Sequence, residues 1–319
     1  MKLEAVGRVV PIGPISRIGL IGFGEVGKIF ASGLRDKPGV ELVSAWDLRF
    51  ADAAQRGCDA DLAQDRDIHA CRSMRALCER SDLVISAVTA SNTLAVAQEA
   101  AQHIGAGSVF LDLNSASPGT KQQAAAAVEA AGAHYVEAGV MTSVPPYGIR
   151  VPMLLGGPRA DALAALLNAW GLDAKPVSER LGVASAIKMC RSVMIKGLEA
   201  LVIESYATAR AYGVEDHVLP TLQETFPSID WSEQGAYFFS RVVQHGKRRA
   251  EEMRESANTV REAGFAPLMT TAVADKQQWV ADCARDGVFD AVDKKARWQD
   301  YADALLAARP GSGSVKPRA

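Results

Sequence analysis

Residues 17–27, Arg-Ile-Gly-Leu-Ile-Gly-Phe-Gly-Glu-Val-Gly, decide the fold of this chain. An apolar run leads directly into three glycines spaced as Gly-x-Gly-x-x-Gly, namely Gly22, Gly24 and Gly27. In a dinucleotide-binding turn, the first glycine permits a tight strand-to-helix turn and the second lets the backbone approach a pyrophosphate. The third lets the helix pack closely on the strand, and the helix N-terminus offers unpaired N–H groups. The stretch therefore predicts a strand, a phosphate-binding turn and a helix.

An acidic residue lies where such a site needs one. Asp47 ends a second apolar run, 40–46, and follows Gly27 by 20 residues. A carboxylate in this position accepts hydrogen bonds from the ribose hydroxyls of NAD and repels the 2′-phosphate of NADP. Arg49 carries a charge that could reach that phosphate, so the sequence favours NAD and leaves NADP open. The alternative is a glycine turn in an α/β domain that binds nothing.

Composition bounds the class of protein. A length of 319 residues predicts about two domains, and 48% hydrophobic with 23% charged residues is typical of a soluble globular protein. The net charge of −2 indicates neither a nucleic-acid partner nor an anionic membrane. Five cysteines without a Cys-x-x-Cys pair predict reduced thiols and a cytoplasmic protein. The sequence shows no signal peptide and no membrane-spanning apolar run, and its isolated histidines predict no metal site.

Short apolar runs alternate with helical segments in the first half of the chain. This alternation predicts an α/β fold, a Rossmann-type, doubly wound parallel sheet. The expected strands are 17–21, 41–46, 81–87, 108–113, 134–138, 151–155 and 174–177. The expected helices between them are 25–36, 51–62, 93–103 and 119–131.

The character of the sequence changes after residue 180. Residues 184–212 contain no proline and predict one long helix that joins the sheet to an all-α domain. We therefore predict an NAD(P)-binding domain over 1–180 and a helical domain for substrate binding and dimerisation over 181–309. The Gly/Ser/Pro-rich segment 310–319 predicts a disordered tail.

Two further stretches carry polar groups that suit chemistry. Residues 112–118, Asp-Leu-Asn-Ser-Ala-Ser-Pro, lie at the C-terminal end of the strand predicted over 108–113, at the sheet edge that faces the ligand crevice. They are also a normal helix start, with Ser117 as the N-cap. Lys188 follows a crowd of small residues at the start of the long helix, where partial burial could tune it as an acid or base. Taken alone, a solvated helix lysine is the commoner case.

These stretches together resemble the motifs of the β-hydroxyacid dehydrogenase superfamily, which includes 3-hydroxyisobutyrate, tartronate semialdehyde and 6-phosphogluconate enzymes. Residues 17–27 match its glycine motif, and 112–118 match its Asp-x-Ser-Thr-x-x-Pro spacing. Residues 182–188 match the glycine-rich turn before its catalytic lysine. Residues 187–192 and 196–201 resemble the 6-phosphogluconate dehydrogenase-like branch that carries a DUF1932 domain.

The resemblance implies roles for individual residues. Lys188 would be the catalytic acid/base between substrate and nicotinamide. The implied substrate-binding residues are Asn114, Ser115, Ser143 and Ser192. The implied cofactor-binding residues are Gly22, Phe23, Gly24, Glu25, Val26, Gly27, Asp47, Arg49, Val88 and Thr89. The resemblance also implies a small-molecule substrate and a homodimer.

Two of the departures from the family pattern concern predicted substrate-binding segments. Ser192 replaces the Asn that usually follows the lysine by four residues, and 142–146 replaces a Ser-Gly-Gly substrate loop. Imine reductases share the fold and lack the lysine, so Lys188 favours alcohol/carbonyl chemistry. We expect an NAD(P)-dependent enzyme that interconverts a hydroxy acid, or a related polar alcohol, and its carbonyl. The alternatives are oxidative decarboxylation of a sugar-acid phosphate and a non-catalytic nucleotide-binding regulator.

Overall fold

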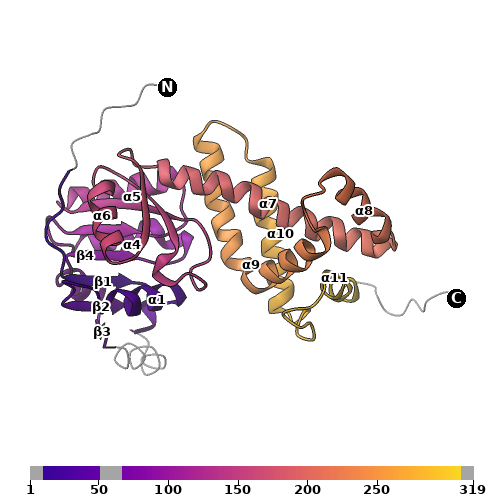
Figure 1. The fold of residues 1–319 in the computed structure, drawn as a ribbon, viewed down its shortest axis with the longest axis horizontal. Helices are drawn as coiled ribbons and strands as arrows, with labels where there is room; N and C mark the ends of the chain where they lie inside the picture. Colours follow the sequence, from indigo (N-terminus) through magenta and orange to yellow (C-terminus); the bar gives the residue numbers. More distant parts are fainter. Residues whose placement is uncertain (1–9, 51–66, 310–319) are drawn as a thin grey trace. The chain divides into compact units, whose positions relative to one another are not determined.

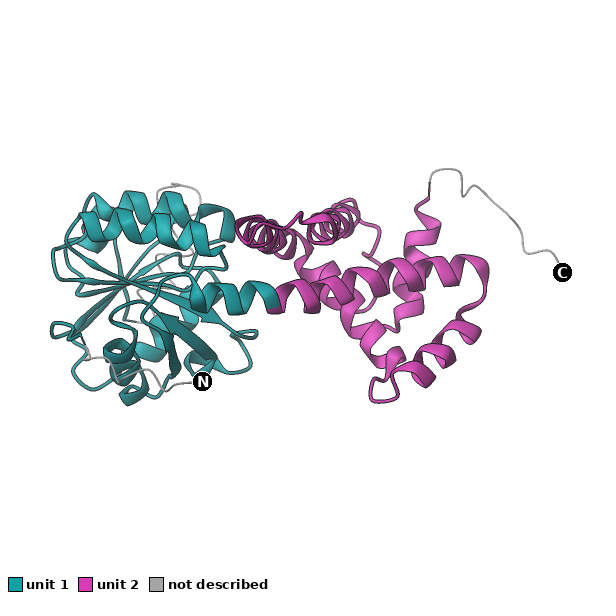
Figure 2. Cartoon of the chain, turned by 90° about the horizontal axis from the view of Figure 1, so that it is seen from above, with its two compact units in different colours: residues 1–190 teal, residues 191–319 magenta. Residues whose placement is uncertain are grey.

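A computed structural model of the chain describes residues 10–50 and 67–309. The chain divides into two compact units, residues 1–190 and 191–319 (Figure 2). The helix predicted over 51–62 and the tail predicted over 310–319 lie outside the described residues. Each unit is described by itself below.

One sheet forms the centre of the first unit (Figure 1). Over the described residues it has eight strands in the order β3-β2-β1-β4-β5-β6-β7-β8. The strands are β1 (Arg17–Ile21), β2 (Leu42–Trp46), β3 (His69–Ala70), β4 (Leu83–Ser86), β5 (Val109–Asp112), β6 (His134–Val140), β7 (Pro152–Gly156) and β8 (Asp173–Ser178). The predicted fold class, a Rossmann-type unit followed by helices, is confirmed.

The sheet is mixed, which corrects the prediction of a wholly parallel sheet. Strands β1 to β6 pair in parallel, but β7 runs antiparallel to β6. The connection 141–151 between these two strands holds only one short 3-10 helix, η3 (Gly148–Arg150). A parallel return needs a longer crossover, so the chain folds back beside β6 in the opposite direction. Strand β8 is parallel to β7, to which α6 (Ala160–Ala169) connects it.

Helices cover both faces of the sheet. In β5, Val109 and Leu111 belong to one apolar cluster and Phe110 to the other, as the period of two in a strand requires. The first cluster includes α1 (Glu25–Leu34) and α6, and the second includes α3 (Met74–Cys78), α4 (Thr93–Ala101) and α5 (Pro118–Ala130). Burial on both faces explains why these strands are continuous apolar runs in the sequence.

The strand order places a topological switch point between β1 and β4. From β1 the chain proceeds outward through β2 and β3, and it then returns to β4 on the other side of β1. In an open α/β sheet, ligands bind in the crevice outside the carboxyl ends of the strands at such a point. The loops after β1, β2, β4 and β5 meet at that edge.

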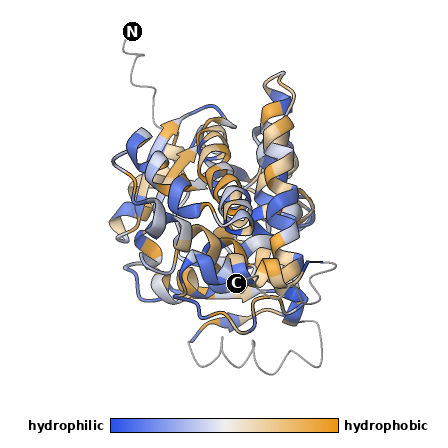
Figure 3. Cartoon of the chain, turned by 90° about the vertical axis from the view of Figure 1, so that its right-hand side faces the viewer, coloured by the Kyte–Doolittle hydropathy of each residue, from blue (hydrophilic) through white to orange (hydrophobic). Residues whose placement is uncertain are grey.

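The second unit is helical. Its elements are the later part of α7 (Val183–Tyr212), α8 (Glu215–Thr225), α9 (Trp231–Glu262), α10 (Leu268–Arg285) and α11 (Trp298–Ala307). Bands of apolar and polar residues on the helices are visible in Figure 3. Aromatic side chains fill the core, where the rings of Tyr206 and Trp298 lie 4.8 Å apart edge to face. None of the described helices is long and apolar enough to cross a membrane.

The predicted domain boundary and the observed division of the chain differ by ten residues. The prediction is at residue 180, and the compact units divide after Cys190, inside α7. The first turn of α7 is tied to β6 of the first unit, because Glu137 accepts hydrogen bonds from Gly182 and Ala184. The beginning of the helix is therefore part of the sheet unit.

Candidate functional site

The glycine turn after β1 has the geometry that its sequence predicts. Gly22 has a φ of +91°, and a Cβ there would lie 2.5 Å from the carbonyl oxygen of Ala87. A Cβ on Gly27 would lie 1.9 Å from the carbonyl oxygen of Gly22. By contrast, a Cβ on Gly24 would meet nothing within 4 Å. Two glycines thus allow the turn to form, and the third leaves open space where a pyrophosphate can approach the helix N-terminus. The turn fits a dinucleotide.

Asp47 is bonded to the glycine turn and to Arg49. Its Oδ2 accepts a hydrogen bond from the Phe23 N–H at 2.7 Å, and its Oδ1 accepts from Arg49 Nε at 2.9 Å. Arg49 also donates to the Phe23 carbonyl at 2.9 Å. Burial alone would raise the pKa of Asp47, but the hydrogen bonds from Arg49 and Phe23 lower it overall. The predicted ribose position therefore holds an ion pair, with one group suited to hydroxyls and one to a phosphate.

Asn114 joins the loops after β4 and β5. Its side-chain oxygen accepts from the Val88 N–H at 2.7 Å, and its amide nitrogen donates to Ser86 Oγ at 2.9 Å. Thr89, the neighbour of Val88, is exposed and accepts from Asn92 Nδ2 at 2.8 Å. The structure thus gives Asn114 a bracing role, in addition to the substrate contact that the resemblance implies.

A buried ion pair lies beneath the 112–118 loop. Lys121 Nζ is 2.9 Å from Asp112 Oδ1, and both side chains are 0% exposed. The hydroxyl of Tyr135 donates to Asp112 Oδ2 at 2.5 Å, and the Asn114 N–H donates to Oδ1 at 2.9 Å. Burial and then the Asp112 carboxylate hold the pKa of Tyr135 well above its usual value.

Sequence reasoning missed Lys121, although a signal was present. Lys121, Ala124, Ala125 and Val128 are the buried residues of α5. Their spacing of i, i+3, i+4 and i+7 is one helix face. A lysine on an otherwise apolar stripe indicates a buried partner.

Lys188 lies at the carboxyl edge of the sheet, next to the loop after β5. Its Nζ donates to Ser115 Oγ at 2.5 Å, across 73 residues of sequence. The lysine is half-buried on α7, and Ser115 belongs to the loop after β5. The structure therefore brings Lys188 to a loop that flanks the switch point.

Two other predicted substrate residues lie elsewhere. Ser143 is half-buried in the loop after β6, next to Val144, whose side chain enters the core of the first unit. Ser192 lies one turn after Lys188 on α7 but belongs to the second unit, where it is buried 3.5 Å from Lys196 Nζ. Neither placement tests a contact with substrate, so both roles stay predictions.

The charged run 247–255 on α9 divides into two parts. Lys247 is exposed, but Arg249 is buried and paired with Glu199. Lys196 pairs with Glu252 in the same unit. Among residues 10–50 and 67–309, no group of three or more His, Cys, Asp or Glu side chains could hold a metal ion.

Fold and turn together define an NAD(P)-binding α/β protein with a helical second unit. Residues 17–163 match the NAD binding domain of 6-phosphogluconate dehydrogenase, and residues 209–280 match the domain of unknown function DUF1932. A conserved hypothetical protein from Sinorhizobium meliloti is 37% identical, with 91% of this chain and 96% of that chain covered at a TM-score of 0.72. The chain belongs to the β-hydroxyacid dehydrogenase superfamily, in the branch that carries DUF1932.

Other solved structures share the fold. A conserved protein of unknown function, described as structurally similar to 3-hydroxyacid dehydrogenases, is 31% identical. The alignment covers 84% of this chain and 98% of that chain, with a TM-score of 0.65. The 3-hydroxyisobutyrate dehydrogenase of Mycobacterium tuberculosis is 14% identical over 91% of this chain and 99% of its own, with a TM-score of 0.62. At that identity the likeness shows the fold alone.

The glycine turn yields a paired prediction. We expect Gly27→Ala to lower the free energy of unfolding by about 3 kcal/mol, because the new methyl group overlaps the Gly22 carbonyl. Gly24→Ala should cost less than about 1 kcal/mol and weaken NAD(P)H binding at least about tenfold, because its methyl group enters the space for the pyrophosphate. Urea unfolding and NAD(P)H fluorescence titration measure the two effects. If the two variants lost the same free energy of unfolding and the same NAD(P)H affinity, Gly27 would not be the structural glycine and Gly24 would not be the one that makes room for the pyrophosphate.

The buried ion pair yields a second prediction. Lys121→Met leaves the Asp112 carboxylate buried without its cation, so we expect a loss of about 3–5 kcal/mol in the free energy of unfolding. Gln123→Met, on the exposed side of α5, is the matched control and should change it by no more than about 0.5 kcal/mol. A loss below about 1 kcal/mol for Lys121→Met, measured in urea, would show that the pair does not hold the loop.

Proposed function

We propose that this chain is an NAD(P)-dependent oxidoreductase that interconverts a hydroxy acid, or a related polar alcohol, and its carbonyl. The observation that carries the proposal is the contact between Lys188 Nζ and Ser115 Oγ. It places a primary amine at the sheet edge that also carries the glycine turn. Hydride transfer to or from a carbinol carbon needs a proton acceptor or donor at the attached oxygen, and an amine can do both.

The cofactor, when bound, supplies the hydride acceptor or donor. The residues proposed to hold it are Gly22, Phe23, Gly24, Glu25, Val26 and Gly27 for the pyrophosphate, Asp47 and Arg49 for the ribose, and Val88 and Thr89 near the nicotinamide. The open space at Gly24 and the Asp47–Arg49 pair support this assignment. NAD remains our first choice and NADP the second.

Lys188 would act as the general base in oxidation and as the general acid in reduction. In oxidation its neutral amine takes the proton of the substrate hydroxyl, and in reduction its ammonium returns one to the carbonyl oxygen. Ser115 holds the amine in place through its hydroxyl. The 31% identical relative, with its described similarity to 3-hydroxyacid dehydrogenases, supports a hydroxy acid as the substrate class.

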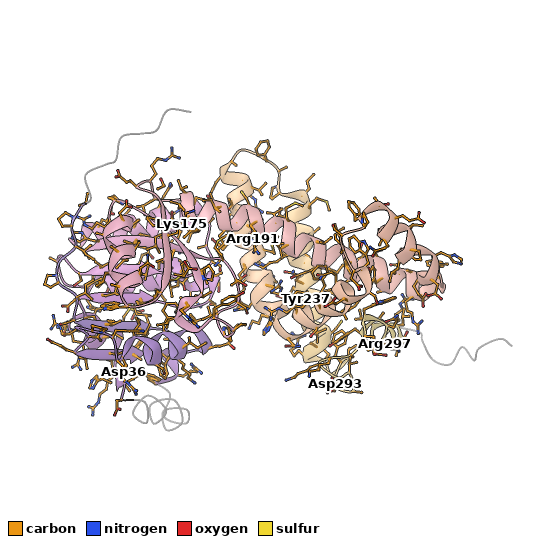
Figure 4. The ribbon with its side chains drawn as sticks, viewed as in Figure 1. Asp36, Lys175, Arg191, Tyr237, Asp293 and Arg297 are labelled. Atoms are coloured by element: carbon orange, nitrogen blue, oxygen red, sulfur yellow. The ribbon has the colours of Figure 1, made fainter. Side chains whose placement is uncertain are left out.

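Replacing the lysine tests the proposal. A panel of hydroxy acids and carbonyls with both cofactors, followed by the absorbance of the reduced nicotinamide, identifies a substrate. For that substrate we expect Lys188→Met to lower kcat at least about 100-fold while NAD(P)H binding stays within about twofold. Lys175→Met, at an exposed lysine of β8 (Figure 4), is the control and should keep full activity. Undiminished turnover by Lys188→Met would refute the acid/base role.

The ion pair at the ribose position gives a prediction about cofactor choice. Arg49→Ala removes a cation suited to a 2′-phosphate and releases Asp47 oxygens for the ribose hydroxyls. We expect the ratio of the NADPH to the NADH dissociation constant to rise about tenfold, which corresponds to about 1.4 kcal/mol. Fluorescence titration with each reduced cofactor measures this ratio without any substrate. An unchanged ratio would show that Arg49 takes no part in the choice.

A further inference from the structure

We infer that Glu137 is a positioning residue for Lys188, because it anchors the first turn of α7 on the sheet and so sets where the lysine meets Ser115. The inference rests on the proposed function, which gives Lys188 its chemical role. Glu137 lies in β6, 51 residues before the lysine, and no motif of the sequence marks it.

The contacts of Glu137 go to a single turn of helix. Its Oε1 accepts from the N–H groups of Gly182 at 2.7 Å and Ala184 at 3.0 Å, and its Oε2 accepts from Ser185 Oγ at 2.8 Å. The side chain is 0% exposed. All three partners donate, which is the pattern of a carboxylate that caps a helix N-terminus from another element. Gly182 has no side chain with which to cap α7 itself.

The charge of Glu137 is matched by the helix. Over the part of the chain that the structure describes, no lysine, arginine or histidine forms an ion pair with this carboxylate. Instead of a cationic side chain, the N–H groups and the partial positive charge at the start of α7 stabilise the carboxylate. A buried carboxylate is costly compared with an apolar side chain of similar size, so stability alone gives little reason for one here. Fixing the start of the helix does give a reason.

Two glycines make room for this arrangement. On β7, a Cβ at Gly156 would lie 2.5 Å from Glu137 Oε1, so only glycine leaves space for the carboxylate. On β6, a Cβ at Gly139 would lie 3.0 Å from the Ala184 carbonyl oxygen and 3.4 Å from Lys188 Cβ. Residues 137 and 139 share one face of the strand. The strand therefore holds the helix at its first turn and lets it approach closely at the lysine.

The consequence is a short mechanical path from β6 to the amine. Lys188 follows Ala184 by one helical turn, so a shift of the first turn moves the lysine with it. Its Nζ has to stay within reach of Ser115 Oγ, on the loop after β5, at 2.5 Å. Strands β5 and β6 are neighbours in the sheet. Glu137 therefore fixes the position of Lys188 relative to the strand that precedes Ser115. Misplacement by about 1 Å can cost about 100-fold in rate.

Glu137→Gln is the direct test, because it keeps the shape of the side chain and removes its charge. We expect the rate at which trinitrobenzenesulfonate modifies Lys188, followed by peptide mass spectrometry, to rise at least about threefold as the lysine loosens from Ser115. Modification of the exposed Lys247 should not change. With an identified substrate, kcat should fall about 10- to 100-fold, while KM and NAD(P)H affinity stay within about twofold.

Gly139→Ala provides a second route to the same displacement and decides the matter if Glu137→Gln does not fold. Its methyl group presses on the Ala184 carbonyl and on Lys188 Cβ, so we expect the same rise in labelling and the same fall in kcat. Gly197→Ala is the matched control on α7, since the nearest atom to its new Cβ lies 4.0 Å away, and it should behave as wild type.

Two results would overturn the inference. One is unchanged labelling of Lys188 in the folded variants at both Glu137 and Gly139. The other is a loss of NAD(P)H affinity that parallels the loss of kcat, since this would indicate a general disturbance of the first unit. Failure of the proposed function is seen separately, as turnover that survives Lys188→Met. The labelling rates need no substrate and report on the position of the lysine in either case.

Discussion

The carboxyl edge of the sheet depends on a backbone contact that only glycine permits. Gly27 lies so close to the carbonyl oxygen of Gly22 that a β-carbon would sit inside it. This contact fixes how α1 leaves β1. Around it, the Gly22 N–H donates to the Trp46 carbonyl and the Ala87 N–H to the Ile21 carbonyl. The turn is thereby joined to the ends of β2 and β4, and three loops are held at one place.

A second layer of polar contacts extends that edge to β5 and β6. Asp112, Lys121 and Tyr135 form a buried group in which each polar head has a partner, and Asn114 joins it to Val88. Buried networks of this kind are stable only when they are fully satisfied, and they then rigidify their surroundings. The loops proposed to meet nicotinamide and substrate are thus braced by the buried group of Asp112, Lys121 and Tyr135.

Much of this could be predicted from the sequence, for reasons that are local. The glycine spacing, the apolar strands and the long helix without proline each depend on neighbours in the chain, and the fold class followed from them. The two-residue strand β3 and the five-residue helix α3 were missed because short elements give little periodic signal, and the helix α6 was missed as well.

The contacts that complete the site are of another kind. Ser115 and Lys188 are 73 residues apart, and Glu137 and Ser185 are 48 apart. No local pattern links such pairs, because they meet only through the order of strands in the sheet. The antiparallel direction of β7 has a different origin, since it follows from the short connection between β6 and β7, which is a local feature of the chain. Resemblance to a family supplied Lys188, but it could not supply residues such as Lys121 and Glu137 that carry no motif.

The bond from the Phe23 N–H to Asp47 has a kinetic meaning as well. It holds the centre of the glycine turn against the end of β2. A loop that is already ordered loses little conformational entropy when a ligand arrives. Association with the dinucleotide would then be governed by diffusion and orientation, and its lifetime by the contacts made afterwards. The carboxylate proposed to meet the ribose is thus also the one that holds the glycine turn in place.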